Sequence, residues 1–278
     1  MIEIKDIFKS FGGNQVLRGV DLTINKGETM VILGRSGCGK SVMLKLIMGL
    51  LKPDSGTIFV NGDEITSFKD NQFNTLRQKF GMLFQAAALF DSMTVDENVG
   101  LALREHTDLK EEDIVRKVKN KLKLVGLTGV EHLKPAELSG GMKKRAGLAR
   151  AVVMDPEILF YDEPSSGLDP VSAAGIRQLV MDLAGKLGVT SVVVTHDMNF
   201  AFHVAGRMGM LDSGRMLKVG SRAEFEALRD GPPTGDKTAD LIRQFIRGES
   251  EGPLTERKLT TAYETDILAS AGLGVPRK

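Results

Sequence analysis

The sequence contains no tryptophan and a single cysteine, Cys38. One cysteine excludes an internal disulfide and a metal site built from several cysteines, and such sparing use fits a reducing compartment. Cys38 lies within a glycine-rich stretch, where a small side chain that fills space is a simpler interpretation than a reactive thiol. We therefore expect neither a disulfide framework nor a cysteine-based metal centre.

Long apolar runs and a surplus of one charge are also missing. Apolar stretches such as residues 30–33 and 191–195 are far shorter than the ~20 residues that cross a bilayer. Residues 1–11 mix charged and apolar side chains, unlike a secretion signal. Lysine and arginine number 37 against 36 acidic residues, so no strong field favours a nucleic acid partner. These features predict a chain that stays in the cytoplasm and binds no nucleic acid.

Short β-branched segments alternate with helical patterns and glycine-containing turns, which is typical of a layered α/β protein. Tight turns such as Gly12-Gly13 separate the first segments and predict an antiparallel part. Helix-length segments separate the later ones and predict a parallel sheet. The strand candidates are residues 2–8, 16–24, 29–33, 57–60, 80–84, 158–161, 191–195, 208–212 and 215–219.

Strand signals vanish between about Thr94 and Asp155, where helix formers dominate. This pattern predicts a helical subdomain, at about residues 86–155, inserted into the sheet. We expect one domain over residues 1–247. The remaining residues, 248–278, have too few apolar side chains for a core, so we expect a tail that is either mobile or docked on another surface.

The strongest chemical signal is the segment GRSGCGKS, which matches the phosphate-loop pattern with a predicted strand before it and a helix after it. Its glycines allow the backbone to wrap around a polyphosphate, so that N–H groups and the next helix N-terminus face negative charge. A plain glycine turn is the competing interpretation. The expected ligands are ATP and Mg²⁺, with Lys40 on the β- and γ-phosphates and Ser41 on the metal. The candidate contacts are Gly34, Arg35, Ser36, Gly37, Cys38, Gly39, Lys40 and Ser41.

An apolar run at residues 158–161 ends in two carboxylates, Asp162 and Glu163. Alone, adjacent acids after a strand could equally form a solvated turn. Together with a phosphate loop, they indicate that Asp162 holds Mg²⁺ through water and that Glu163 polarises the attacking water as general base.

A second anion-binding feature opens the helix that begins near Ser139. Here Ser139 and the N–H groups of Gly140 and Gly141 form another helix N-terminus that favours a phosphate. The sequence Leu138-Ser139-Gly140-Gly141 resembles the signature of ABC ATPases. This resemblance extends over residues 2–220, with the motifs in the family's order.

The resemblance implies the ABC ATPase fold of the P-loop NTPases: a mixed-sheet core, an antiparallel β subdomain and an inserted α-helical subdomain. It also implies a dimer with a second copy of the chain, in which the signature of one copy closes over the ATP of the other. Phe11 corresponds to the aromatic residue that stacks on adenine, although a lone phenylalanine is also a common core residue. Gln85 corresponds to the glutamine that senses Mg²⁺ and the attacking water. Asp169 corresponds to the residue that links the two active sites, and His196 to the histidine that contacts the γ-phosphate.

Further stretches are similar to the ATPases of Mla-type (Mce-associated) bacterial lipid transporters. They are residues 81–109, the methionine at Met142 after the signature, and residues 243–254. This implies an ATPase on the cytoplasmic face of the bacterial inner membrane, bound beneath a permease that moves phospholipid or another lipid. A periplasmic Mce lipid-binding protein and a STAS-domain regulator are the further expected partners. The permease would place a short helix in a groove near residues 85–98, where residues 86–89, Phe90 and Met93 supply apolar surface. Packing in the core explains any one of these side chains equally well.

Two alternatives remain at this stage. One is the ATPase of an importer for a polar small molecule such as an amino acid, because such ATPases share the general pattern. The other is a regulatory ABC ATPase that transports nothing and signals through ATP-dependent dimerisation. Long coiled-coil insertions and a second cassette are lacking, which excludes the chromosome-structuring and translation-factor classes.

Overall fold

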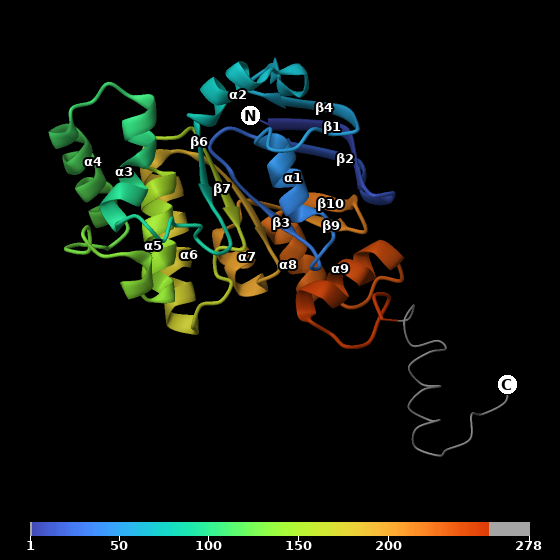
Figure 1. Ribbon diagram of the computed structural model, residues 1–278. Coiled ribbons are helices and arrows are strands. Elements are labelled where there is room, and N and C mark those ends of the chain that lie inside the picture. Colours follow the sequence, from blue (N-terminus) through green and yellow to red (C-terminus); the bar gives the residue numbers. More distant parts are fainter. Residues whose placement is uncertain (1, 256–278) are drawn as a thin grey trace, which may run out of the picture. The chain divides into compact units, whose positions relative to one another are not determined.

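The computed structural model of the chain describes residues 2–255 (Figure 1). The chain divides into two compact units, one that ends at Gly220 and one that begins at Ser221. The first unit contains two sheets and most of the helices. Among residues 2–255, no helix is long and apolar enough to span a membrane.

The first sheet is antiparallel and has the strand order β2-β1-β4-β5. Its strands are β1 (Ile2–Phe11), β2 (Asn14–Ile24), β4 (Ser55–Val60) and β5 (Asp63–Glu64). The β1–β2 hairpin pairs as far as Phe11 with Asn14, so both strands are longer than the sequence pattern indicates. Asp6 has φ 49° at a bulge in β1, and a Cβ atom on Gly56 would lie 2.3 Å from its carbonyl oxygen. Only glycine fits at that crossing.

The second sheet has six strands in the order β10-β9-β3-β8-β7-β6. Its strands are β3 (Thr29–Leu33), β6 (Phe80–Leu83), β7 (Ile158–Asp162), β8 (Thr190–Thr195), β9 (Arg207–Asp212) and β10 (Arg215–Ser221). The strands from β9 to β6 in this order pair in parallel. Parallel sheets are covered on both faces, which explains why β3 and β8 are almost continuous apolar runs. The predicted fold class, with an antiparallel sheet and a mixed sheet, is confirmed.

Helix α1 (Lys40–Ile47) lies against one face of this sheet, and α7 (Met198–Val204) contacts β3 and β8. A single core joins α1, the antiparallel sheet and alternate side chains of β3, β7 and β8. Met30, Ile32 and Phe160 in this core are completely buried. The core therefore holds α1, and with it the loop that precedes α1, rigidly against the strand ends.

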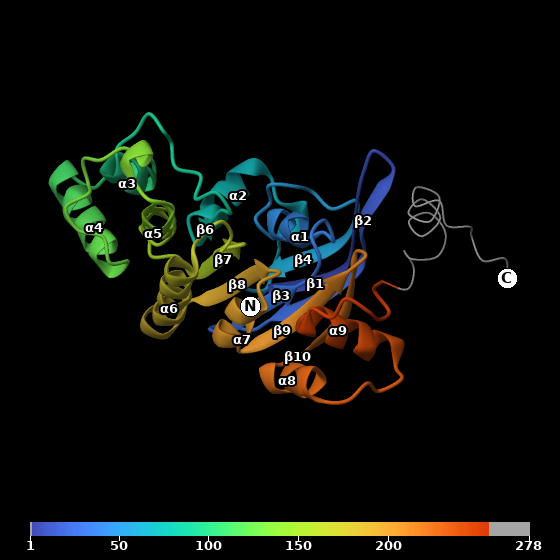
Figure 2. The same cartoon turned by 90° about the horizontal axis from the view of Figure 1, so that it is seen from below.

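The helices of the region between β6 and β7 form a separate group beside β6 (Figures 1 and 2). They are α3 (Val95–His106), α4 (Glu111–Leu124), the short 3₁₀ helix η2 (Pro135–Glu137) and α5 (Gly140–Ala151). Thr94 and Glu97 form a capping box at the start of α3, and the Ser139 side chain caps α5. Two further helical segments, η1 (Ile65–Ser67) and α2 (Asp70–Arg77), precede β6, and α6 (Pro170–Leu187) follows β7.

The second unit contains α8 (Arg222–Asp230) and α9 (Lys237–Arg247). Gln244 is buried, and its side chain accepts a hydrogen bond from Leu254 N at 2.7 Å and donates one to Glu249 O at 3.2 Å. Arg243 forms an ion pair with Glu249 at 2.9 Å. The chain after Gly248 therefore folds back onto α9 as far as Thr255. Most of the expected tail, residues 256–278, lies outside the described residues.

Asn98, on α3, is a completely buried polar residue that fixes the loop before the helix. Its Oδ1 accepts a hydrogen bond from Phe90 N at 2.7 Å. Its Nδ2 donates to the carbonyl oxygens of Phe90, Met93 and Thr94 at 2.9 to 3.2 Å. One side chain thus satisfies both backbone groups of Phe90.

We expect Asn98→Ala to destabilise the protein by about 1–3 kcal/mol, because it leaves partly buried backbone groups without their partners. Amide exchange across residues 86–94 should accelerate, as measured by hydrogen–deuterium exchange. Asn120→Ala, at an exposed position of α4, is the matched control. Equal exchange in both variants would contradict the role of Asn98.

Candidate active site

The phosphate loop joins the end of β3 to the start of α1, as the sequence predicts. A Cβ atom on Gly34 would lie 2.2 Å from the Leu211 carbonyl oxygen, so this position tolerates only glycine. Gly37 and Gly39 have φ of 79° and 108°, a conformation that residues with a Cβ atom rarely adopt. The three glycines shape a loop whose last residue leads directly into the N-terminus of α1. Such an N-terminus favours a bound phosphate.

Lys40, the first residue of α1, is buried at the mouth of the loop. Its ammonium donates hydrogen bonds to Gly34 O at 2.7 Å and Arg35 O at 3.0 Å, and it lies 3.7 Å from Glu163 Oε1. Arg35 is in turn paired with Asp212 at the end of β9, at 2.6 Å. The loop is therefore tied both to its own lysine and to the neighbouring strand.

Ser41 and Asp162 meet across the site, where Ser41 Oγ donates to Asp162 Oδ1 at 2.9 Å. Burial raises the pKa of Asp162, and the hydrogen bond from Ser41 opposes this shift. Among residues 2–255, no group of three or more His, Cys, Asp or Glu side chains could hold a metal ion. A hydroxyl and one carboxylate fit Mg²⁺, which protein sites commonly bind through few side chains together with water and substrate phosphates.

Glu163 follows Asp162 in the left-handed backbone conformation, with φ 47°. Its Oε2 accepts a hydrogen bond from Thr195 Oγ1 at 3.0 Å, and its Oε1 lies 2.9 Å from His196 Nδ1. The His196 side chain is 61% exposed, whereas that of Glu163 is only 11% exposed. The carboxylate is thus held in a fixed orientation beneath a histidine that faces outward.

An open cavity of about 340 Å³ is lined by Lys40, Ser41, Glu163 and His196 among others, whereas Asp162 does not line it. Gln85 reaches it from the end of β6, with its Nε2 3.4 Å from Ser166 Oγ. Two apolar lining residues, Val16 and Val42, were not anticipated, because nothing in the sequence separates them from ordinary core valines. The lining residues are Val16, Ser36, Gly37, Gly39, Lys40, Ser41, Val42, Gln85, Glu163 and His196.

Phe11 does not line this cavity. Phe11 is 44% exposed at the β1–β2 turn, and its ring centroid lies 5.3 Å from the Lys9 ammonium. The structure therefore leaves the adenine contact of Phe11 as a prediction.

The signature residues Ser139, Gly140 and Gly141 also do not line the cavity. They lie beside the start of α6, where a Cβ atom on Gly141 would be 3.0 Å from Ser172 Oγ. Asp169 caps α6, and its hydrogen bonds with Ser172 and Val171 lower the pKa of its carboxyl group. The chain thus carries two glycine-containing helix N-termini, at the starts of α1 and α5, and only the first faces the cavity.

Comparison with known proteins identifies the family, because the sequence profile of the ABC transporter matches residues 17–166. The chain belongs to the ABC transporter family. As an ATP-binding subunit of this family, it binds and hydrolyses ATP. The resemblance to ABC ATPases that the signature indicates is therefore confirmed.

Relatives that are named for transport functions align over almost the whole chain. The probable ribonucleotide transport ATP-binding protein mkl of Mycobacterium leprae (strain TN) is 44% identical over 98% of this chain and 76% of that protein. The intermembrane phospholipid transport system ATP-binding protein MlaF of Escherichia coli (strain K12) is 35% identical over 96% of each chain.

A solved structure supports the same family. The ATP-binding cassette MJ0796, in a post-hydrolysis state with ADP and Pi, has a TM-score of 0.74 and 32% identity. The match covers 80% of this chain and 99% of that one, and MJ0796 is a dimer there.

Burial raises the pKa of the Cys38 thiol, and the Lys40 ammonium only partly opposes this effect. The thiolate fraction of Cys38 at pH 7.5 is then smaller than that of an ordinary thiol. We therefore expect iodoacetamide to label Cys38 severalfold more slowly than it labels the thiol of free glutathione. The rate should climb as the pH rises towards the elevated pKa. Added ATP and Mg²⁺ should slow the labelling further, because phosphates held by the loop would cover the thiol. Cys38→Ser provides the unlabelled control; fast labelling that ATP does not change would contradict this geometry.

Proposed function

We propose that the chain is the ATP-hydrolysing subunit of a transporter complex that moves phospholipid or another lipid between membranes. The observation that supports a lipid as the cargo is the match to MlaF, a phospholipid transport ATPase, over 96% of both chains. The stretches at residues 81–109 and 243–254 and the methionine at Met142 support the same assignment. The family membership itself supplies ATP binding and hydrolysis.

A second candidate cargo is a ribonucleotide, because mkl is named for ribonucleotide transport and is 44% identical to this chain. It is a polar small molecule, the class that the sequence pattern alone leaves open. The ATPase core looks the same in both cases, since cargo is selected by other subunits. The two candidates therefore differ in their partners rather than in this site.

In the proposed reaction, the loop N–H groups and the Lys40 ammonium hold the β- and γ-phosphates. Ser41, Asp162 and Gln85 would bind Mg²⁺, which supplies positive charge on the phosphate oxygens. Glu163 accepts a proton from a water molecule while the oxygen of that water attacks the γ-phosphorus. The bond from that phosphorus to the β–γ bridging oxygen breaks, and ADP and phosphate leave. His196, whose Nδ1 lies 2.9 Å from Glu163 Oε1, would contact the γ-phosphate.

We propose a dimer with a second copy, in which Ser139, Gly140 and Gly141 of one copy close over the nucleotide of the other. Their position outside the chain's own cavity supports this arrangement, because two phosphate-binding helix starts then meet one ATP. Asp169, next to the signature, would link the two sites.

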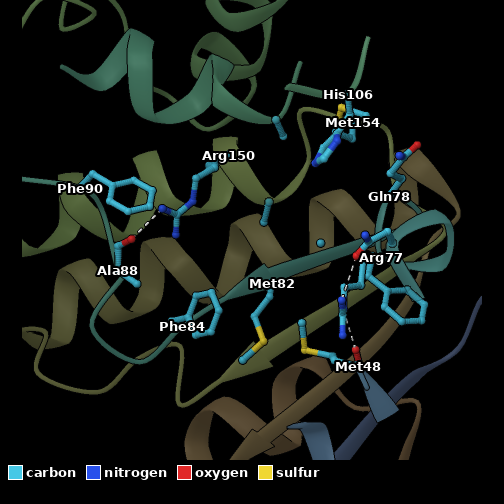
Figure 3. A pocket seen from close by; sticks show the side chains of 15 residues that line it. Met48, Arg77, Gln78, Met82, Phe84, Ala88, Phe90, His106, Arg150 and Met154 are labelled. Atoms are coloured by element: carbon cyan, nitrogen blue, oxygen red, sulfur yellow. Dashed lines mark hydrogen bonds between the residues drawn. The ribbon is translucent and has the colours of Figure 1, made fainter. Parts of the chain in front are cut away.

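A largely apolar pocket of about 630 Å³ suits the docking of the proposed permease (Figure 3). Met48, Met82 and Phe84 supply apolar lining, and Phe90, which is 50% exposed, stands at its edge. Arg150 holds this edge in place, because it donates to the carbonyl oxygens of Ala87 and Ala88 at 2.8 and 2.7 Å.

The apolar residues expected in the permease groove do not all line this pocket. Ala88 and Phe90 line the pocket, whereas Ala87 is buried in the core and Met93 lines a different depression, on the helical subdomain. We propose that the complex lies on the cytoplasmic face of the bacterial inner membrane and includes an Mce lipid-binding protein and a STAS-domain regulator. Nucleic acid is not among the proposed partners.

We expect Glu163→Gln to bind ATP within a few-fold of wild-type affinity and to lose about 10²-fold or more of kcat, because a proton acceptor is removed. ATP and Mg²⁺ should trap the variant as a dimer in gel filtration. Lys40→Ala is the contrasting variant, since it should weaken ATP binding itself in calorimetry. Undiminished turnover of Glu163→Gln, with a monomeric elution in ATP, would disprove its proposed role.

The cargo is tested by purifying the tagged chain from its native membrane and identifying the proteins and lipids that accompany it. We expect a multi-spanning permease, an Mce protein and bound phospholipid, and phospholipid should stimulate the ATPase of the purified complex. A ribonucleotide that stimulates turnover where phospholipid does not would establish the second candidate instead.

The same purification tests the groove. Phe90→Asp should reduce the amount of permease recovered at least severalfold while ATP binding stays unchanged. Leu109→Asp is the matched control, because Leu109 is similarly exposed, at 42%, but does not line the pocket. Equal recovery of permease with both variants would place the docking surface elsewhere.

A further inference from the structure

Lys144 is a buried lysine on the helix that begins with the signature. Among the lysines of residues 2–255, only Lys40 and Lys144 are buried, at 6% and 4% exposure. Lys40 belongs to the phosphate loop, whereas no role assigned above involves Lys144. A buried ammonium is costly unless it is paired, so its position calls for a specific partner.

The partner is the backbone of residues 163–169, the loop between β7 and α6 that begins with Glu163 and is here called the catalytic loop. The Lys144 ammonium donates a hydrogen bond to the Glu163 carbonyl oxygen at 3.2 Å. The same oxygen accepts a hydrogen bond from Ser166 N at 3.1 Å, and Glu163 N donates to Val194 O at 2.9 Å. These three bonds hold the backbone N–H and carbonyl groups of Glu163. Its left-handed backbone conformation is uncommon for a residue with a Cβ atom.

Charge reinforces this contact. Burial lowers the pKa of Lys144, and the charges of Asp162 and Glu163 oppose that shift. The lysine is therefore the cationic neighbour of the carboxylate pair on the side of α5, whereas Lys40 approaches from α1. Its position in α5 lies ~7.5 Å along the helix axis from the signature serine, Ser139, at 1.5 Å per residue.

We propose that Lys144 is a positioning residue for Glu163. Lys144 ties α5, the helix that begins with the signature, to the catalytic loop of the same chain. When the α5 N-terminus contacts a partner's nucleotide, any shift of α5 then changes the orientation of the Glu163 carboxylate through Lys144. The proposal rests on the proposed role of Glu163 as general base. It assigns Lys144 no contact with ATP.

The test compares kcat and KM for ATP in the full-length chain. Lys144→Met keeps the apolar stem and removes the charge, so we expect kcat to fall at least tenfold while KM changes less than threefold. Lys144→Arg, which restores a cationic donor, should recover at least a third of wild-type kcat. Lys119→Met, an exposed lysine of α4, is the control with the same loss of charge and should match wild type.

A double-variant cycle separates positioning from a general structural effect. In the Glu163→Gln background, Lys144→Met should cause less than a twofold further loss, because Lys144 acts through Glu163. Independent losses that multiply would overturn the proposal, as would a kcat within twofold of wild type in Lys144→Met or no recovery in Lys144→Arg. If Lys144→Met fails to fold, Lys144→Gln replaces it, with the same expected loss and the same overturning result.

The outcomes also distinguish the two levels of the argument. An inactive Glu163→Gln with a fully active Lys144→Met would remove only the role of Lys144. A fully active Glu163→Gln would remove the general-base assignment and this proposal together.

Discussion

Parallel pairing of β3, β8 and β7 is the constraint on which the site depends. Leu33 pairs with Thr195, and Asp162 pairs with Val194, so the three strands end at nearly the same level. The residues that follow them, Gly34, His196 and Glu163, must then emerge together at one edge. A shift of one strand by a single residue would turn its side chains to the other face and separate these groups.

The features that follow from local rules could be predicted from the sequence. The phosphate loop is recognisable because its glycines and lysine have fixed spacing, and β3 and β8 because buried parallel strands are continuous apolar runs. The ends of β1 and β2 could not be placed, since polar residues such as Asn14 extend the hairpin through backbone bonds alone. The two-residue strand β5 was missed for the same reason.

The features of the site that could not be predicted from the sequence depend on tertiary contacts. Lys143 and Lys144 are adjacent lysines in a helix, yet Lys143 is partly exposed while Lys144 is buried against Glu163. Nothing in a single sequence tells them apart, because the difference arises from which face of α5 meets the strand ends. The sequence predicts a general base at Glu163, but the bonds of its side chain to Thr195 and His196 depend on the alignment of β7 with β8.

The location of the signature outside the chain's own cavity has a consequence for mixtures of altered subunits. In the proposed dimer, a copy with a damaged phosphate loop and a copy with a damaged signature would still assemble one intact catalytic centre between them. Their second centre would carry both defects. Subunits impaired in different motifs would thus complement each other, whereas two copies impaired in the same motif would not.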